Sequence, residues 1–336
     1  MLQMPGLMVV PQGRMKSGKR AIWISWEDHR RTTELCGALG VPLYTFTSKG
    51  SRISRYVVLT VRTVLKLMEE RPDLLFVQNP SLALSLLGVF YKLAFGKRLI
   101  VDAHTSGVFP FDGKSALLNL VCRYIHRKSD LTIVTTSSLK DAVERNRGMG
   151  FVLQDRLPGI SPGKAIKLKG AKNILYICSF SWDEPYNEVI EAASRVGSGV
   201  CVYITGNYRK APGIRREALP ENVVLTGFLP EEEYLGLLSS ADVLVDLTTR
   251  EDCLLCGAYE AVALGKPFII SKTLALMEYF TSGCVYAGNT AEGIAEAIRA
   301  ALSTQEELEE EVKEFREELR SSWEEKFTDF KKNAGV

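Results

Sequence analysis

The feature that most constrains this chain is a regular alternation of short apolar runs with stretches of helical periodicity. Ten runs rich in β-branched and aromatic residues cover 21–25, 43–46, 74–78, 98–102, 131–135, 174–178, 200–205, 223–226, 243–246 and 267–271. Helical patterns lie between them, for example at 115–126, 139–145 and 231–239. Continuous apolar strands that alternate with helices predict an α/β protein whose parallel sheets are covered on both faces.

The length and the number of strands favour two domains. Ten strands are many for one open sheet, and 336 residues exceed roughly 100–200 residues per domain. The stretch 157–172, LPGISPGKAIKLKGAK, lacks a period and predicts a linker. We expect Rossmann-like domains at 1–160 and 161–305, with parallel sheets facing across a ligand-binding cleft, and a C-terminal helix at 306–336 that packs back on them. One apolar face marks this helix: Leu308, Val312, Phe315, Leu319, Trp323 and Phe327.

The charge is divided unequally along the chain. Residues 1–170 hold 26 Lys and Arg against 12 Asp and Glu, whereas residues 171–336 hold 16 against 28. A basic surface attracts anionic lipid headgroups, phosphates or nucleic acid. Residues 49–66 interleave basic and apolar side chains, which favours an anionic membrane surface; a core helix with a solvated basic face is the alternative. No recognition motif indicates nucleic acid as a partner.

Three features bear on the cellular location. The first residues, MLQMPGLMVVPQ, do not resemble a signal peptide. The longest apolar stretch, 82–95, has 14 residues and contains Lys92, too short for the roughly 20 residues of a membrane span. Seven cysteines, an odd number, indicate reduced thiols, and Cys253-x-x-Cys256 has no second pair beside it. We expect a cytoplasmic protein that is peripheral at the inner face of the membrane.

The segment 248–260, TTREDCLLCGAYE, follows a strand and opens a helix. The start of a helix binds phosphate well through free N–H groups. Asp252 and Glu260 could accept hydrogen bonds from sugar or ribose hydroxyls; the alternative roles are a helix cap and a solvated helix residue. Three backbone N–H groups would point toward the ligand: those of Leu255, Cys256 and Gly257.

A second basic element follows the strand at 200–205. Arg209 or Lys210, in the turn that begins at Gly206 and includes Tyr208, could neutralise a departing diphosphate; an exposed pair of turn charges is the alternative. The chain contains no Asp-x-Asp, the motif of metal-dependent sugar transfer, so we expect no metal and no cofactor.

The segment 248–260 resembles the acidic-x7-acidic region of the retaining GT-B glycosyltransferases of family 4 type, and AVALGKPFIIS after it resembles their usual continuation. The resemblance implies a nucleotide-sugar donor, with Glu260 on the ribose and Asp252 facing the sugar and diphosphate. The turn at Gly227 and Phe228 resembles the one that holds the nucleotide base, and Trp323 resembles the aromatic residue that closes a GT-B chain.

The first half departs from family 4, because Gln78 stands where that family usually has His. The segments 78–80, 99–104 and 179–184 resemble the inverting β-1,4-mannosyltransferases that add the first mannose to chitobiosyl-pyrophosphoryl-dolichol. This second resemblance implies a polyprenyl-pyrophosphate-linked glycan acceptor at a membrane. Gln78, Asn79 and Arg30 would then lie on the acceptor side.

An inverting enzyme needs a base for the acceptor hydroxyl. His29 follows the first strand, and His104 follows the strand at 98–102, where Asp102 could orient its ring. Asp28 and Glu27 are alternative bases, and we favour His29 or Asp28. His126 is expected to be a solvated charge at a helix end.

These observations predict a hexosyltransferase that moves a sugar from a GDP- or UDP-linked donor to a polyprenyl-pyrophosphate-linked glycan, with inversion. One alternative is a retaining family 4-type enzyme in which Gln78 or His104 contacts the sugar. Two others are a non-catalytic GT-B subunit that binds lipid or a partner enzyme, and a GT-B nucleotide-sugar epimerase.

Overall fold

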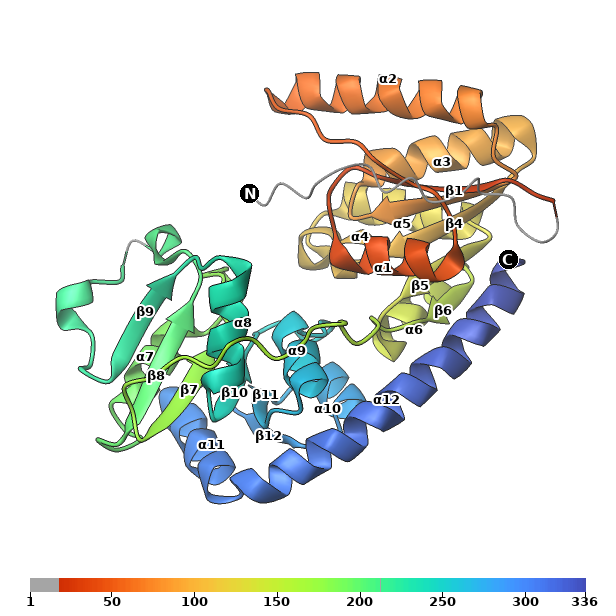
Figure 1. The fold of residues 1–336 in the computed structure, drawn as a ribbon. Helices are drawn as coiled ribbons and strands as arrows, with labels where there is room; N and C mark the ends of the chain where they lie inside the picture. Colours follow the sequence, from red (N-terminus) through yellow and green to blue (C-terminus); the bar gives the residue numbers. More distant parts are fainter. Residues whose placement is uncertain (1–17, 212) are drawn as a thin grey trace. The chain divides into compact units, whose positions relative to one another are not determined.

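The computed structural model describes residues 18–211 and 213–336. The opening segment MLQMPGLMVVPQ lies outside the described residues. The chain forms two compact units (Figure 1): unit 1 comprises Met1–Arg156 with Trp323–Val336, and unit 2 comprises Leu157–Ser322. The C-terminal helix thus contributes residues to both units. No helix in the described ranges is long and apolar enough to cross a membrane.

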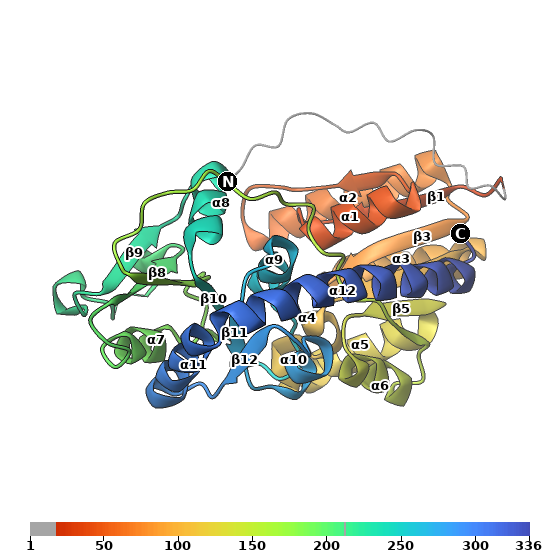
Figure 2. The ribbon, with the colours of Figure 1, turned by 60° about the horizontal axis from the view of Figure 1, so that its bottom comes forward.

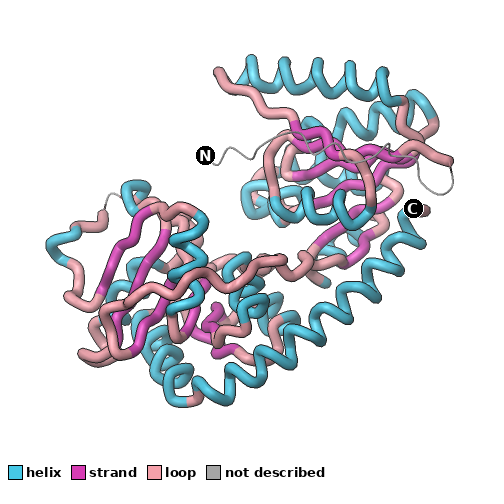
Figure 3. Tube along the Cα trace, viewed as in Figure 1, coloured by secondary structure: helices cyan, strands magenta, loops and turns pink. Residues whose placement is uncertain are grey.

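Unit 1 is built on a six-stranded parallel sheet in the order β2-β1-β3-β4-β5-β6. Figure 3 draws the strands in magenta. In β1, Ile24 pairs with Tyr44 of β2 on one side and with Val77 of β3 on the other. Its strands are β1 (Ala21–Ser25), β2 (Leu43–Thr45), β3 (Leu74–Asn79), β4 (Arg98–Ala103), β5 (Leu131–Val134) and β6 (Gly150–Val152). Its helices are α1 (Arg30–Leu39), α2 (Arg52–Glu70), α3 (Leu82–Phe95), α4 (Thr105–Val108), the 3-10 turn η1 (Pro110–Gly113), α5 (Ala116–Lys128) and α6 (Ser137–Arg145).

Alternation along the strands divides the core of unit 1 between the two faces of the sheet. Ile22 and Ile24 belong to the cluster that α2, α3, α5 and α6 cover. Trp23 and Phe76 point to the opposite face, where their rings stack at 4.9 Å under α1 and the end of the C-terminal helix. Both faces are therefore buried, which explains the continuous apolar runs.

Unit 2 has a second six-stranded parallel sheet, in the order β12-β11-β10-β7-β8-β9. In β7, Leu175 pairs with Tyr203 of β8 and with Leu244 of β10. Its strands are β7 (Lys172–Tyr176), β8 (Val200–Thr205), β9 (Val223–Gly227), β10 (Val243–Asp246), β11 (Phe268–Ser271) and β12 (Cys284–Ala287). Its helices are α7 (Tyr186–Ala193), the turns η2 (Tyr208–Lys210) and η3 (Arg216–Ala218), α8 (Glu231–Ser240), α9 (Cys256–Leu264), α10 (Leu274–Tyr279) and α11 (Ala291–Ser303), as Figure 2 shows from a second side. Helix α12 (Gln305–Ala334) begins in unit 2 and ends in unit 1.

The structure confirms the α/β class and the parallel sheets, and it adds two strands to the ten predicted. Both additions, β6 and β12, are strands at the edge of a sheet, of three and four residues. The predicted linker runs without helix or strand up to β7. Hydrogen bonds anchor it from Gly163 onward, beginning with one from the Gly163 N–H to Ser239 Oγ at 2.8 Å.

The strand orders mark where a ligand fits in each unit. In an open parallel sheet, ligands bind at the carboxyl ends of strands where the strand order reverses. In unit 1 this point lies between β1 and β3, and in unit 2 it lies between β7 and β10.

Candidate functional site

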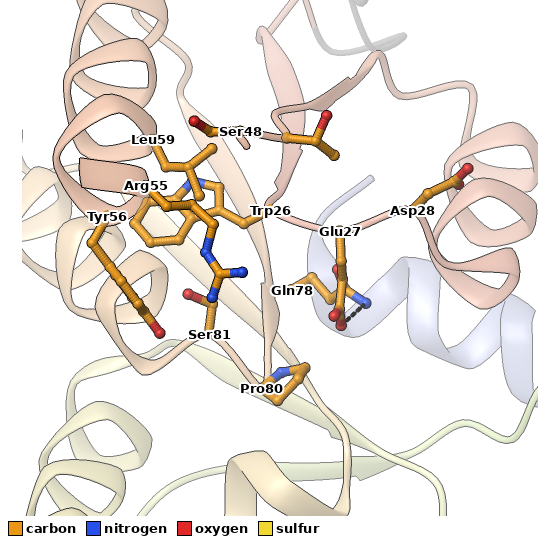
Figure 4. A pocket seen from close by; sticks show the side chains of 11 residues that line it. Trp26, Glu27, Asp28, Ser48, Arg55, Tyr56, Leu59, Gln78, Pro80 and Ser81 are labelled. Carbon is orange, nitrogen blue, oxygen red and sulfur yellow. Dashed lines mark hydrogen bonds between the residues drawn. The ribbon is translucent and has the colours of Figure 1, made fainter. Parts of the chain in front are cut away.

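A pocket of about 410 Å³ opens at the carboxyl ends of β1 and β3 in unit 1 (Figure 4). It lies where the strand order predicts a ligand site, and we call it the β1–β3 pocket. Three short segments and the first half of α2 form its walls. The lining residues are Trp26, Glu27, Asp28, Thr47, Ser48, Arg55, Tyr56, Leu59, Gln78, Pro80 and Ser81.

Hydrogen bonds hold the floor of the β1–β3 pocket in place. Gln78 is 2% exposed, and its amide donates from Nε2 to Glu27 Oε1 at 3.2 Å. Its Oε1 accepts from Ser25 Oγ, which also contacts the Glu27 backbone. The predicted acceptor-side Gln78 therefore lines the pocket and orients an exposed carboxylate beside it.

The wall that α2 supplies is basic and aromatic. Figure 4 shows Arg55 on one side of the pocket and Glu27 with Gln78 on the other. Trp26 donates from Nε1 to Thr63 Oγ1 at 2.9 Å and meets Tyr56 edge to face at 5.8 Å. A guanidinium opposite a carboxylate suits a ligand that carries both an anionic group and hydroxyls. The sequence prediction placed Arg55 in a membrane stretch and missed its place in the pocket.

The two histidines predicted as catalytic pack against each other rather than line the pocket. The rings of His29 and His104 meet edge to face at 4.5 Å. His104 Nε2 lies 3.9 Å from Asp102 Oδ2, beyond hydrogen-bond range, and burial lowers the pKa of His104 to about 4. The expectation that Asp102 orients this ring is wrong in this structure, because the Asp102 carboxylate forms an ion pair with another residue.

That residue is Arg31, which the sequence analysis did not single out. Its guanidinium is 3% exposed, contacts Asp102 and Asp155, and donates from Nη2 to the Leu153 carbonyl at 2.9 Å. Burial alone would lower the pKa of Arg31, but the two carboxylates outweigh this effect and raise it above its usual value. The cluster joins α1, β4 and the segment after β6.

Three further predictions in unit 1 need correction. Asn79 is fully buried, outside the pocket, and its Nδ2 donates to the Gly107 carbonyl at 3.3 Å. Arg30 is half-buried, 3.7 Å from Glu34, and does not line the pocket. His126 is fully buried, and burial lowers its pKa to about 4, so it is not a solvated helix charge.

In unit 2, the segment after β7 is tied to the segment after β10. The Glu184 carboxylate accepts hydrogen bonds from the backbone N–H groups of Ser179 and Ser181 at 3.0 and 2.8 Å, which link the two ends of this loop. Asp183 Oδ2 accepts from Thr248 Oγ1 at 3.0 Å, and its carbonyl accepts the Thr249 N–H at 2.7 Å. These bonds give the edge between β7 and β10 a defined shape.

The predicted basic turn lies beside this loop. Gly206 adopts a φ of 91°, where a Cβ would collide with the Cys178 carbonyl, so only glycine fits. Arg209 and Lys210 are exposed, Tyr208 is half-buried, and Lys210 Nζ lies 3.5 Å from the Ser179 carbonyl. The turn therefore holds two cations at the carboxyl ends of β7 and β8.

The start of α9 differs from the prediction in one respect. The Gly257 N–H donates to Asp246 Oδ2 at 2.7 Å, so this group is not offered to a ligand. Asp246 ends β10, and burial raises the pKa of its carboxyl well above the usual range although the Gly257 N–H opposes the shift. Leu255 is the N-cap residue and Cys256 is exposed, so their predicted role toward phosphate stays a prediction.

The remaining predicted donor residues lie around α9 and β9. Glu260 Oε2 accepts from the Tyr234 hydroxyl at 2.6 Å, a partner on α8 that the sequence did not reveal. Asp252 is half-buried in the loop before α9. Gly227 has a φ of 75° at the end of β9, and Phe228 beside it is 71% exposed.

Sequence reasoning also missed an exposed aromatic residue. Trp182 is 72% exposed in the loop after β7, with the Arg250 guanidinium 5.9 Å from its ring centre. An isolated tryptophan in a loop has no periodic signal, so only the structure shows its position beside Arg250. Among the residues that the structure describes, no group of three or more His, Cys, Asp or Glu side chains could hold a metal ion.

Sequence comparison adds information on unit 2. Residues 171–304 match the family model described as Glycosyl transferases group 1. Over 121 residues the chain is 31% identical to a GDP-mannose-dependent alpha-(1-6)-phosphatidylinositol dimannoside mannosyltransferase of Mycobacterium tuberculosis. The alignment covers 35% of this chain and 32% of that enzyme, so the chain spans about a third of the length of this curated relative.

Similar solved structures cover nearly the whole chain. A sucrose-phosphate synthase from Thermosynechococcus elongatus has a TM-score of 0.73 at 17% identity, covering 93% of this chain and 97% of that one. Anabaena HepE in complex with UDP and glucose has a TM-score of 0.66 at 14% identity and covers 91% of both chains. A glycosyltransferase from Rickettsia africae has a TM-score of 0.63 at 10% identity, covering 94% and 90%.

Similarity at such low identity shows the fold alone, whereas the family model matches the sequence of unit 2 itself. The chain therefore has the GT-B fold, and residues 171–304 of its second unit match the glycosyl transferases group 1 model.

Proposed function

We propose that this chain is a glycosyltransferase that moves a sugar from a nucleotide-sugar, GDP- or UDP-linked, to a lipid-linked glycan acceptor. The observation that carries the proposal is the match of residues 171–304 to group 1 glycosyl transferases. The same unit holds two exposed cations at the carboxyl ends of β7 and β8 and the carboxylate of Glu260 on α9. Lys210 would neutralise the departing diphosphate, and Glu260 would accept hydrogen bonds from the ribose hydroxyls.

The acceptor belongs in the β1–β3 pocket in this proposal. Arg55 would hold the phosphate that links glycan to lipid, and the hydrogen-bonding floor around Gln78 would hold sugar hydroxyls. A bidentate guanidinium matches phosphate geometry. The mycobacterial relative is named for a phosphatidylinositol dimannoside acceptor, which supports a lipid-linked substrate for this chain.

The structure changes our preferred base. Glu27 and Asp28 are exposed and line the pocket, whereas His29 and His104 pack on each other outside its lining. A general base must reach the proton that it removes. We therefore propose Glu27 or Asp28 as the base of an inverting transfer, in which the acceptor oxygen bonds to the anomeric carbon and the nucleoside diphosphate departs.

Thermal shift with UDP, GDP, ADP, CMP and their common sugars tests the donor. A nucleotide at 100 times its dissociation constant should stabilise the protein by about 2.7 kcal/mol. Lys210→Ala should weaken the response. Lys140→Ala, which replaces a half-buried lysine on α6 of unit 1, should leave it unchanged. If no nucleotide shifts the transition, the non-catalytic alternative replaces the proposal.

Transfer itself is tested with the responding donor and polyprenyl-linked acceptors in detergent, followed by mass analysis of the product. Loss of the base should lower kcat by about 10²–10⁴-fold without changing nucleotide affinity. We expect this loss in either Glu27→Gln or Asp28→Asn. Full activity in both variants would remove the two carboxylates from the mechanism, and product of retained anomeric configuration would favour the retaining alternative.

A further inference from the structure

Helix α2 turns its broader apolar face away from the core. The sheet buries only a narrow stripe of this helix, namely Leu59, Thr63 and Leu67. A second apolar stripe recurs at spacings of 4, 4, 3 and 4 residues, one helical face, and is exposed: Ile53 80%, Val57 57%, Val61 51%, Val64 43% and Met68 50%. An amphipathic helix normally buries its apolar face, so this one lacks its partner among the described residues.

The exposed apolar surface continues on the neighbouring helices. Helices α2, α3 and α5 lie next to one another on the same face of the sheet, and Figure 1 shows α2 alongside α3. Of 20 exposed large hydrophobic side chains in the described part of the chain, 13 lie on these three helices. Beyond the α2 stripe, this outer surface comprises Val58, Leu65, Phe90, Leu93, Phe95, Leu117, Leu120 and Tyr124. Exposed apolar side chains gathered on three neighbouring helices indicate a docking site.

The charge of the three helices indicates what docks there. Together α2, α3 and α5 carry eight Lys and Arg residues and two Asp and Glu residues. Arg55 and Arg62 of α2 lie beside Val58, at the border of its exposed apolar side. Lys66 is paired with Glu69 and Glu70 in the last turn of the helix. An apolar face flanked by cations is the arrangement of helices that lie in the interface of an anionic bilayer.

We propose that the outer surface of α2, α3 and α5 docks unit 1 on an anionic lipid bilayer. The apolar stripe of α2 enters the boundary between headgroups and acyl chains, and exposed basic side chains of the three helices, such as Arg62 and Arg127, contact lipid phosphates. Because α2 also supplies Arg55, Tyr56 and Leu59 to the β1–β3 pocket, docking brings one wall of the pocket to the level of the headgroups. This last consequence rests on the proposed function, whereas the docking does not.

Vesicle flotation of the full-length chain tests the proposal. We expect binding to vesicles of phosphatidylcholine with phosphatidylglycerol, and at least tenfold weaker binding to phosphatidylcholine alone or at high salt. Leu65→Glu should reduce binding at least tenfold, because it places a carboxylate on the docking surface. Leu274→Glu is the matched control: Leu274 of unit 2 is 65% exposed against 64% for Leu65, and its variant should bind as the wild type does.

Three outcomes would overturn the proposal. The first is that the chain floats with neither kind of vesicle. The second is an equal loss of vesicle binding in Leu65→Glu and Leu274→Glu. The third is a concentration-dependent dimer that Leu65→Glu alone abolishes, which would assign the surface to a second copy of the chain. The assay uses no donor or acceptor, so its result is independent of sugar transfer. The thermal unfolding midpoint of Leu65→Glu without ligand, expected to match that of the wild type, shows that the variant is folded.

Discussion

At the scale of single residues, Glu260 has two roles that can be separated by mutation. Its carboxylate holds the Tyr234 hydroxyl at 2.6 Å and is proposed to hold the donor ribose. Hydrogen bonds to a charged group contribute about 1.5–3 kcal/mol, so Glu260→Gln should weaken nucleotide binding by about 10- to 100-fold. Isothermal calorimetry measures the affinity. Tyr234→Phe keeps the carboxylate and should stay within about threefold of the wild type; equal losses in both variants would make Glu260 only a support for α8.

His126 predicts a component of the pH dependence of stability. Burial lowers its pKa from 6.5 to about 4, so between these values the unfolded chain binds more protons than the folded chain. The free energy of unfolding should therefore fall as pH drops from about 6.5 to 4, by about 3 kcal/mol at most from this residue. Urea unfolding at pH 7 and 4.5 measures the drop, which should be smaller in His126→Asn. Identical drops would show that His126 titrates normally in the fold.

At the scale of elements, Arg31 holds three parts of unit 1 together. Arg31 lies on α1, and its guanidinium forms ion pairs with Asp102 of β4 and with Asp155 after β6. Removing one partner of a buried ion cluster leaves uncompensated charge and costs about 3–5 kcal/mol. We expect Arg31→Met to lower the free energy of urea unfolding by that amount. Its neighbour Arg30, 3.7 Å from Glu34 and more exposed, is the control, and Arg30→Met should cost about 1 kcal/mol or less. A small effect at Arg31 would mean that water reaches the two carboxylates.

At the scale of the whole molecule, α12 contributes buried side chains to the hydrophobic cores of both units. Phe315 is buried in unit 2 and Phe330 is buried in unit 1, on the same helix. Replacing a buried phenylalanine by alanine costs about 3–5 kcal/mol. Phe330→Ala should therefore reduce hydrogen-exchange protection of β1, β3 and β4, and Phe315→Ala should reduce that of β7 and β10. Mass spectrometry of the exchanged peptides checks this. Loss of protection across both units in either variant would show that they unfold as one.

Local patterns in the sequence determined the α/β class, the parallel strands, the apolar face of α12 and the resemblance of 248–260 to a donor site. These depend on residues close together in the chain, whose periodicity reflects burial directly. The pocket was only partly foreseen. Gln78 was predicted from a family resemblance and Asp28 from its place after a strand, whereas Arg55 was assigned to a different role.

Contacts between distant segments were decided by the tertiary structure alone. Arg31 meets Asp102 and Asp155 across 71 and 124 positions, and the Gly257 N–H is taken by Asp246 rather than left for a ligand. Periodicity also showed that α2 is amphipathic but not which of its faces meets the sheet. That choice depends on how the helix packs beside β1 and α3, so only the fold reveals that the broader apolar stripe is turned outward.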